Sequence, residues 1–214
     1  MQLNPIYYNE QHIAFADNVR RFVQKEMTPF VNEWDEAETF PRELYKKAAE
    51  IGLLGLGFSE EYGGIPDADP FYSLLAGIEM AKAGSGGVHI SLMVYTIGAP
   101  PIQHFGSEEL KARVLPGIIS GEKISVLAIT EPGGGSDVAA LQTKAVRDGD
   151  YYIVSGEKTF ITSGIRADYY TVAVRTDPTK TGAEGISMLL IDAHSEGTVS
   201  YTHLRAHETV LDLV

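Results

Sequence analysis

A glycine-rich segment near the middle of the 214-residue chain has the residue types best suited to bind a ligand. It spans residues 130–137, has the sequence TEPGGGSD and follows the apolar run ISVLAIT at residues 124–130. Three successive glycines allow the backbone to approach a ligand closely or to adopt positive φ. The backbone amides and the hydroxyl of Ser136 can bind phosphate oxygens or the polar edge of a heterocycle. Taken alone, the same residues are also typical of an exposed Pro-Gly turn.

The elements that precede this segment have the apolar spacing of helices. Up to about residue 120, apolar residues recur every three or four positions, as on one face of a helix. The first such set is Ile13, Ala16, Val19, Phe22 and Val23. Thr28-Pro29 supplies a candidate N-cap and first helical residue, so we expect the first helix to break there. The next helix should begin at Pro41 and end at Gly52.

After Gly121 the pattern changes to short runs of β-branched and aromatic residues separated by turns. Asp148-Gly149-Asp150 is a hairpin turn signal between two of these runs. The expected strands cover residues 124–130, 144–147, 151–155, 158–162, 169–175 and 186–192. The pattern therefore predicts an α+β fold, with an N-terminal all-helical domain (1–121) followed by a truncated antiparallel β-domain (122–198). No GxGxxG fingerprint is present, so a Rossmann fold is not expected.

Composition excludes several classes of protein. A formal net charge of -12 argues against a nucleic-acid surface and against docking on anionic lipid. The chain has no cysteine, which excludes disulfides and thiolate chemistry. No apolar run approaches the roughly 20 residues of a membrane span, so we expect no membrane contact. The opening residues lack the pattern of a secretory or transit signal, which predicts a cytoplasmic protein.

Four segments resemble, in order, the motifs of the acyl-CoA dehydrogenase family. They are GLLGLGFSEEYGG at 52–64, HFGSEELKARVLPGIISGE at 104–122, AITEPGGGSDVAA at 128–140 and KTFITSG at 158–164. The resemblance covers about residues 8–197. It implies noncovalently bound FAD, an acyl-CoA substrate, an electron-transfer flavoprotein as acceptor and a homo-oligomer, either dimer or tetramer.

The resemblance also implies a role for each matched residue. The cofactor-binding residues would be Leu127, Ile129, Thr130, Gly135, Ser136, Phe160, Ile161 and Thr162. Backbone groups of Ile129 and Thr130 would meet the pyrimidine edge of the flavin. Ser136 would hold a cofactor phosphate or the substrate thioester chain. Phe160, where many relatives have Trp, would pack on the ring, and the Thr162 hydroxyl would lie near N5. Without the motif, an ordinary strand with Phe160 inward and Thr162 outward is the alternative.

The catalytic base is not expected in this chain. Family members α,β-desaturate an acyl thioester, and their base is a Glu in a C-terminal helical bundle that we do not find here. Glu131 lies beside the flavin segment, but nothing in the sequence predicts a raised pKa. Arg166 and Arg175 could contact a CoA phosphate, but we interpret them as solvated charges at strand ends. We therefore expect an inactive fragment of an acyl-CoA dehydrogenase. The alternatives are an acyl-CoA oxidase, another flavin oxidase or monooxygenase on the same scaffold, or a non-catalytic flavin-binding fragment.

Residues 199–214 do not continue the family pattern and resemble the translation of a sequencing adapter. His203 and His207 have the spacing of helical zinc ligands. However, Glu208 follows the second histidine and not the first, and no third ligand is evident. We therefore expect no metal site.

Overall fold

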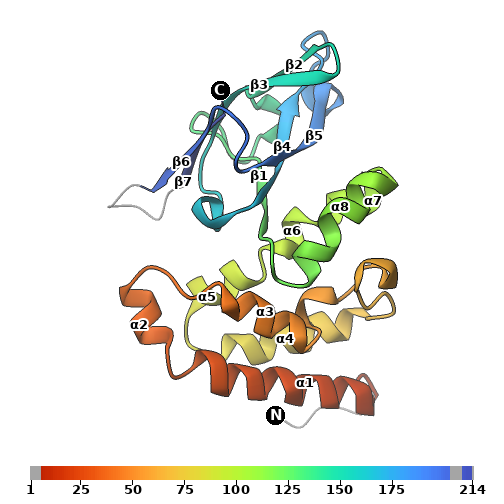
Figure 1. The fold of residues 1–214 in the computed structure, drawn as a ribbon, viewed down its shortest axis with the longest axis vertical. Coiled ribbons are helices and arrows are strands. Elements are labelled where there is room, and N and C mark those ends of the chain that lie inside the picture. The colour runs from red at the N-terminus through yellow and green to blue at the C-terminus, as the bar shows by residue number, and fades with distance from the viewer. Residues whose placement is uncertain (1–5, 203–208, 214) are drawn as a thin grey trace. The chain divides into compact units, whose positions relative to one another are not determined.

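The computed structural model describes residues 6–202 and 209–213, and these form two compact units (Figure 1). The first unit contains the described residues up to Met93 together with residues 107–122. The second contains residues 94–106 and the described residues from Lys123 onward. The division after residue 122 lies close to the expected boundary, but the short helical stretch 94–106 belongs with the sheet. No helix within the described ranges is long and apolar enough to cross a membrane.

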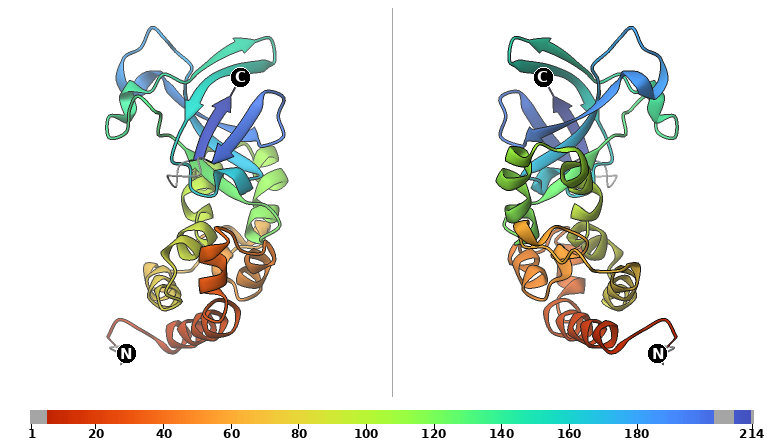
Figure 2. Two further views of the ribbon diagram at one scale, coloured as in Figure 1. Left: turned by 90° about the vertical axis from the view of Figure 1, so that its left-hand side faces the viewer. Right: turned by 90° about the vertical axis from the view of Figure 1, so that its right-hand side faces the viewer.

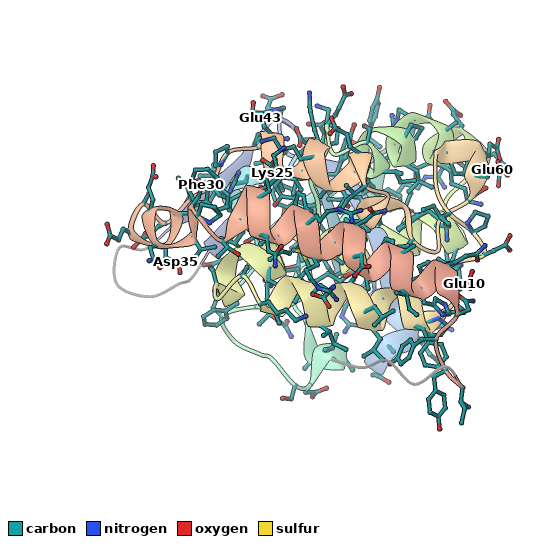
Figure 3. The ribbon with its side chains drawn as sticks, turned by 90° about the horizontal axis from the view of Figure 1, so that it is seen from below. Glu10, Lys25, Phe30, Asp35, Glu43 and Glu60 are labelled. Atoms are coloured by element: carbon teal, nitrogen blue, oxygen red, sulfur yellow. The ribbon has the colours of Figure 1, made fainter. Side chains whose placement is uncertain are left out.

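The first unit is a group of helices that pack through apolar faces. Its helices are α1 (Glu10–Phe22), α2 (Val31–Glu36), α3 (Glu43–Glu50), α4 (Pro70–Ala81), α5 (Gly86–Leu92) and α8 (Glu108–Ile119). Short 3-10 turns occupy Leu53–Gly55 and Glu60–Tyr62. In Figure 3, Glu10 and Lys25 lie towards opposite ends of the first helical stretch, with α4 beside it. The buried face of α1 carries Phe15, Ala16, Val19 and Phe22, whereas Ile13 of the predicted set is 41% exposed.

One histidine connects the N-termini of two of these helices. Asn9 and His12 form a capping box at the start of α1, and the Asn9 amide donates to Nδ1 of His12 at 3.1 Å. Nε2 of His12 is therefore the donor to the Asp69 carboxylate, at 3.0 and 3.1 Å. Asp69 in turn caps α4, where its carboxylate accepts from the Phe71 amide. The starts of α1 and α4 are thus held together through a buried imidazole.

The break near Thr28-Pro29 differs from the prediction. A π-helical turn, Val23–Met27, follows α1, and α2 starts at Val31 without a side-chain cap. The Thr28 amide donates to the Val23 carbonyl at 2.9 Å, so the widened turn carries the chain up to the proline. Gly52 follows α3 as expected, with φ of 78°.

The second unit is a mixed sheet with two short helices (Figures 1 and 2). Its strands are β1 (Ser125–Ala128), β2 (Lys144–Asp148), β3 (Tyr151–Lys158), β4 (Tyr169–Arg175), β5 (Ile186–Asp192), β6 (Thr198–Thr202) and β7 (Thr209–Leu213). Its helices are α6 (Tyr95–Gly98) and α7 (Pro100–Phe105). The strand order is β1-β4-β2-β3-β7-β6, and β5 pairs with β4. The α+β class is confirmed.

The prediction of a wholly antiparallel domain was wrong in one part of the sheet. β1 and β4 pair in parallel, from Ser125↔Tyr169 to Ala128↔Val172. β2 and β4 meet in parallel at Lys144↔Arg175. Parallel neighbours require a crossover connection, and the glycine-rich loop with the β2–β3 hairpin forms that connection. The loop consequently leaves the sheet at the carboxyl end of β1, a largely buried strand that pairs with β4.

Two other expectations about strands were changed by the structure. The predicted strand 158–162 is wrong, because β3 ends at Lys158 and the next residues are irregular. Thr159 donates its amide to the Thr130 carbonyl, and Phe160 has φ of 57°, which turns the chain out of the strand. Residues of the expected non-family tail form β6 and β7, and β7 pairs with β3.

Candidate ligand-binding site

The glycine-rich loop closes on itself directly after β1. Glu131 and Gly134 exchange two backbone hydrogen bonds of 3.1 Å, which makes Pro132-Gly133 the tip of a tight turn. A Cβ on Gly133, Gly134 or Gly135 would meet no atom within 4 Å. These glycines are therefore not needed for protein packing, and their open side is available to a ligand. Ser136 is exposed, and its hydroxyl and amide have no partner among the described residues.

A shallow cavity of about 440 Å³ lies beside the loop. Its lining includes Ile129, Thr130 and Gly135 of the predicted site, with Gln142, Thr143, Gly156 and Glu157 on the other side. Ser136, Phe160 and Thr162 do not line it. Leu127 lies in β1, half-buried, one strand position before the core residue Ala128. The cavity therefore accounts for only part of the predicted set.

The second predicted segment presents an aromatic ring to solvent. Phe160 is 58% exposed, whereas Ile161 is 3% exposed and Thr162 is half-buried. The alternative of an ordinary strand with Phe160 inward is thereby contradicted. A phenylalanine held at positive φ with its ring exposed is strained and has no packing reason within its own unit. An exposed aromatic ring can instead pack on a planar ligand.

The two predicted segments are joined directly. The Thr159 amide donates to the Thr130 carbonyl at 2.9 Å. Nζ of Lys158 donates to the Ile129 carbonyl, also at 2.9 Å. Ser163, just after the second segment, has φ of 59° and a buried hydroxyl oxygen without a partner among the described residues. The structure thus brings the carbonyls of Ile129 and Thr130 next to the chain that carries Phe160 and Thr162.

A buried carboxylate fixes the base of the loop. Oε1 of Glu131 accepts from the Thr143 amide (2.9 Å), the Thr143 hydroxyl (2.6 Å) and Nζ of Lys158 (2.8 Å). Oε2 accepts from the Gln142 amide at 2.6 Å. Burial alone would raise the pKa of Glu131, but the hydrogen bonds from Lys158, Thr143 and Gln142 lower it to about 2. Glu131 is accordingly an ionised structural anchor.

Sequence reasoning missed Lys158 and Thr143. Lys158 is the first residue of the KTFITSG segment, and its side chain is fully buried. Lysine is rarely buried without a partner, but nothing in the sequence shows that position to be buried. A Cβ on Gly156 would lie 2.5 Å from Oγ1 of Thr143, so a glycine is required where β3 passes this threonine. The roles of both residues depend on contacts between segments that are distant in the sequence, so the sequence alone does not reveal them.

Arg175 also differs from expectation. Nη2 donates to the Ala139 carbonyl at 2.7 Å, and Nη1 donates to the Lys180 carbonyl at 3.3 Å. The interpretation as a solvated strand-end charge was wrong for this residue, because its fork of donors holds two loops together. Arg166 lies half-buried in the 3-10 turn Gly164–Arg166. No group of three potential metal ligands is found within the described residues, and His203, His207 and Glu208 lie outside them.

Two models of known protein domains match the two parts of the chain. The model for the acyl-CoA dehydrogenase N-terminal domain matches residues 9–122. The model for the acyl-CoA dehydrogenase middle domain matches residues 126–210, which extends past the expected boundary at residue 198. The chain belongs to the acyl-CoA dehydrogenase family.

Two curated relatives are identical to this chain at more than a third of the aligned positions. Isobutyryl-CoA dehydrogenase, mitochondrial, of Dictyostelium discoideum is 38% identical over 88% of this chain and 44% of its own length. The short-chain specific acyl-CoA dehydrogenase of Clostridium acetobutylicum is 40% identical over 84% of this chain and 47% of its own. The chain thus spans about half the length of these relatives.

Solved structures have the same fold. An acyl-CoA dehydrogenase from Geobacillus kaustophilus superposes with a TM-score of 0.88 at 38% identity, over 97% of this chain and 56% of that one. A glutaryl-CoA dehydrogenase from Mycobacterium smegmatis in complex with FADH2 gives 0.87 at 31% identity, over 97% and 53%. A chain described under the electron transferring flavoprotein of Acidaminococcus fermentans gives 0.90 at 34% identity, over 100% and 57%.

Proposed function

We propose that this chain is the flavin-binding part of an enzyme that dehydrogenates the α,β-bond of an acyl-CoA thioester. The observation that carries the proposal is the junction between the glycine-rich loop and the Phe160 segment through Thr159 and Thr130. These two segments resemble the family's flavin motifs, and a similar structure contains FADH2. Their adjacency supports a single site for FAD in this unit.

The residues present fit a flavin. Open glycines and the free amide and hydroxyl of Ser136 suit phosphate oxygens or the thioester chain of the substrate. The exposed ring of Phe160 suits the face of an isoalloxazine, and the buried hydroxyl oxygen of Ser163 is a polar group beside Thr162 without a partner among the described residues. Half-buried Leu127 and buried Ile161 would support the site from within the unit. Bound FAD supplies the acceptor for the hydride that leaves the substrate β-carbon.

We propose that the base which removes the α-proton lies outside this chain, in the C-terminal helical bundle that the family resemblance implies. Glu131 is unsuited to the task, because four hydrogen bonds lower its pKa to about 2. A carboxylate so strongly stabilised is a weak base near neutral pH. The chain by itself should therefore bind flavin weakly and show no desaturation.

We assign the remaining partners on the same basis. The electron acceptor is an electron-transfer flavoprotein, in line with the resemblance and with the Acidaminococcus structure noted above. The full-length protein would be a homodimer or homotetramer in the cytoplasm. An oxidase on the same scaffold is the alternative, in which oxygen takes the electrons.

A titration with FAD tests the proposed function. Flavin fluorescence should be quenched by the purified 214-residue chain, and Ser136→Ala should weaken the affinity several-fold. Ser195→Ala is the matched control, because Ser195 is exposed and remote in sequence from both segments. Absence of FAD binding would contradict the proposal. With FAD and an acyl-CoA, turnover above free flavin would contradict the assignment of the base to another domain, and peroxide formation would favour the oxidase.

A further inference from the structure

The ion pair between Glu131 and Lys158 is unusually buried. Their side chains are 9% and 0% exposed, and the two charged atoms are 2.8 Å apart. The pair Lys123–Asp168 in the same unit leaves its lysine 46% exposed. Burying a charge pair is unfavourable unless hydrogen bonds satisfy the remaining donors and acceptors. Stability alone is therefore a weak explanation for a lysine at this position.

Lys158 has a second acceptor, a backbone carbonyl of the predicted flavin-binding segment. Nζ donates to the Ile129 carbonyl at 2.9 Å as well as to Glu131. The Ile129 carbonyl belongs to the same peptide unit as the Thr130 amide, and that amide has no acceptor among the described residues. A cation bound to the carbonyl end of a peptide polarises it, so that the N–H end becomes a stronger donor. Burial keeps this effect unscreened by water.

We infer that Lys158 is a positioning residue that orients and polarises the 129–130 peptide towards the pyrimidine edge of the flavin, and that Glu131 holds Lys158 in place. This inference rests on the proposed function, which brings that edge to Ile129 and Thr130. Glu131 provides the counter-charge that allows an ammonium to remain buried, and it anchors both the loop and Thr143. Reduction adds negative charge to the pyrimidine edge of a flavin. A stronger Thr130 donor therefore stabilises the reduced flavin more than the oxidised form.

A single variant and a double variant that removes both charges separate this role from a purely structural one. Lys158→Met removes the cation and leaves Glu131 buried without its partner, so both the melting temperature and the flavin potential should fall. Adding Glu131→Gln removes the stranded charge. The double variant should recover much of the melting temperature, while the flavin potential stays low. A structural ion pair would instead recover both quantities together.

Each variant of the chain is characterised by three measurements. They are thermal unfolding, the midpoint potential of bound FAD, and the chemical shift of the Thr130 amide without FAD. We expect the reduced flavin to bind about tenfold more weakly relative to the oxidised form in Lys158→Met, a shift of about −30 mV for a two-electron couple. The Thr130 amide proton should move upfield in both the single and the double variant. Lys123→Met, which breaks the exposed pair, should leave the potential and the amide unchanged.

The outcomes distinguish the inference from the proposed function. If the wild-type chain does not bind FAD, the proposed function fails, and the Thr130 amide in the FAD-free chain still tests Lys158. An unchanged amide in Lys158→Met, or recovery of both amide and potential in the double variant, would overturn the inference.

Discussion

The amide of Thr159 and the carbonyl of Thr130 form a hydrogen bond of 2.9 Å between two segments that the sequence keeps apart. Each segment on its own resembles an ordinary turn or strand. Together they place an open glycine loop beside an exposed aromatic ring at positive φ. This junction is the physical basis for assigning one ligand site to the second unit.

Acid stability should depend on Glu131. Its pKa is 4.5 as an ordinary carboxyl and about 2 in the folded chain. The unfolded chain therefore binds more protons between about pH 4.5 and pH 2, and the free energy of unfolding falls as the pH drops through this window. The loss should approach about 3 kcal/mol. Denaturant unfolding as a function of pH measures it.

Glu131→Gln should flatten that acid dependence and lower stability at pH 7. Glu157→Gln is the matched control, because Glu157 neighbours Lys158 but its carboxylate makes no hydrogen bond or ion pair with the described residues. An equal pH dependence in wild type and Glu131→Gln would contradict the anchoring role of this carboxylate.

Gly156→Ala should disrupt the base of the loop. The added Cβ would lie 2.5 Å from Oγ1 and 2.6 Å from Cα of Thr143, which donates two hydrogen bonds to Glu131. Overpacking of this kind typically costs about 1–3 kcal/mol. Chemical denaturation checks the value, and Gly77→Ala in α4, where nothing lies within 4 Å, should be neutral or stabilising. A neutral Gly156→Ala would show that β3 does not constrain Thr143.

Asn9→Ala should destabilise the helical unit by about 1 kcal/mol, because it removes the capping box at α1. The lost bond is the one that the Asn9 side chain accepts from the His12 amide, whereas the bond from the Asn9 backbone amide to Nδ1 of His12 does not depend on that side chain. Thermal unfolding measures the effect. Asn32→Ala, at an exposed position of α2, should be close to neutral, and an equal loss in both variants would argue against the cap.

Phe160→Ala should weaken FAD binding by about tenfold, an amount in keeping with about 1–1.5 kcal/mol for loss of an aromatic contact. It should change stability little, because the ring is 58% exposed. Phe105→Ala serves as control, since Phe105 is 88% exposed in α7 of the same unit. Fluorescence titration gives the affinities, and equal affinities for the two variants would contradict a flavin-facing role.

Local patterns predicted much of the fold. The 3.6-residue spacing predicted α1, and the glycine at position 52 predicted the end of α3, where it has positive φ. The runs Tyr169–Arg175 and Ile186–Asp192 were predicted as strands and are β4 and β5. The predictions that were wrong concern contacts between residues far apart in the chain. The parallel pairing of β1 with β4 is set by the crossover between them, which no local period encodes.

The site shows the same division. The resemblance of residues 128–140 and 158–164 to family motifs was the basis for predicting a flavin site at Gly135, Ser136 and Phe160, because residue types alone also fit a turn and a strand. Thr159 and Phe160 have strand-forming side chains, yet a bond to Thr130 and a positive φ override that propensity. The burial of Lys158 could not be predicted, because its two acceptors, Glu131 and the Ile129 carbonyl, are supplied by another segment.

Hydrogen exchange of the backbone amides, with and without FAD, tests the central claim most directly. If one flavin site is formed by both segments, FAD should slow exchange at residues 129–137 and 159–164 together, with no comparable change in α1 or α4. Protection confined to one of the segments, or located in the helical unit, would contradict the account.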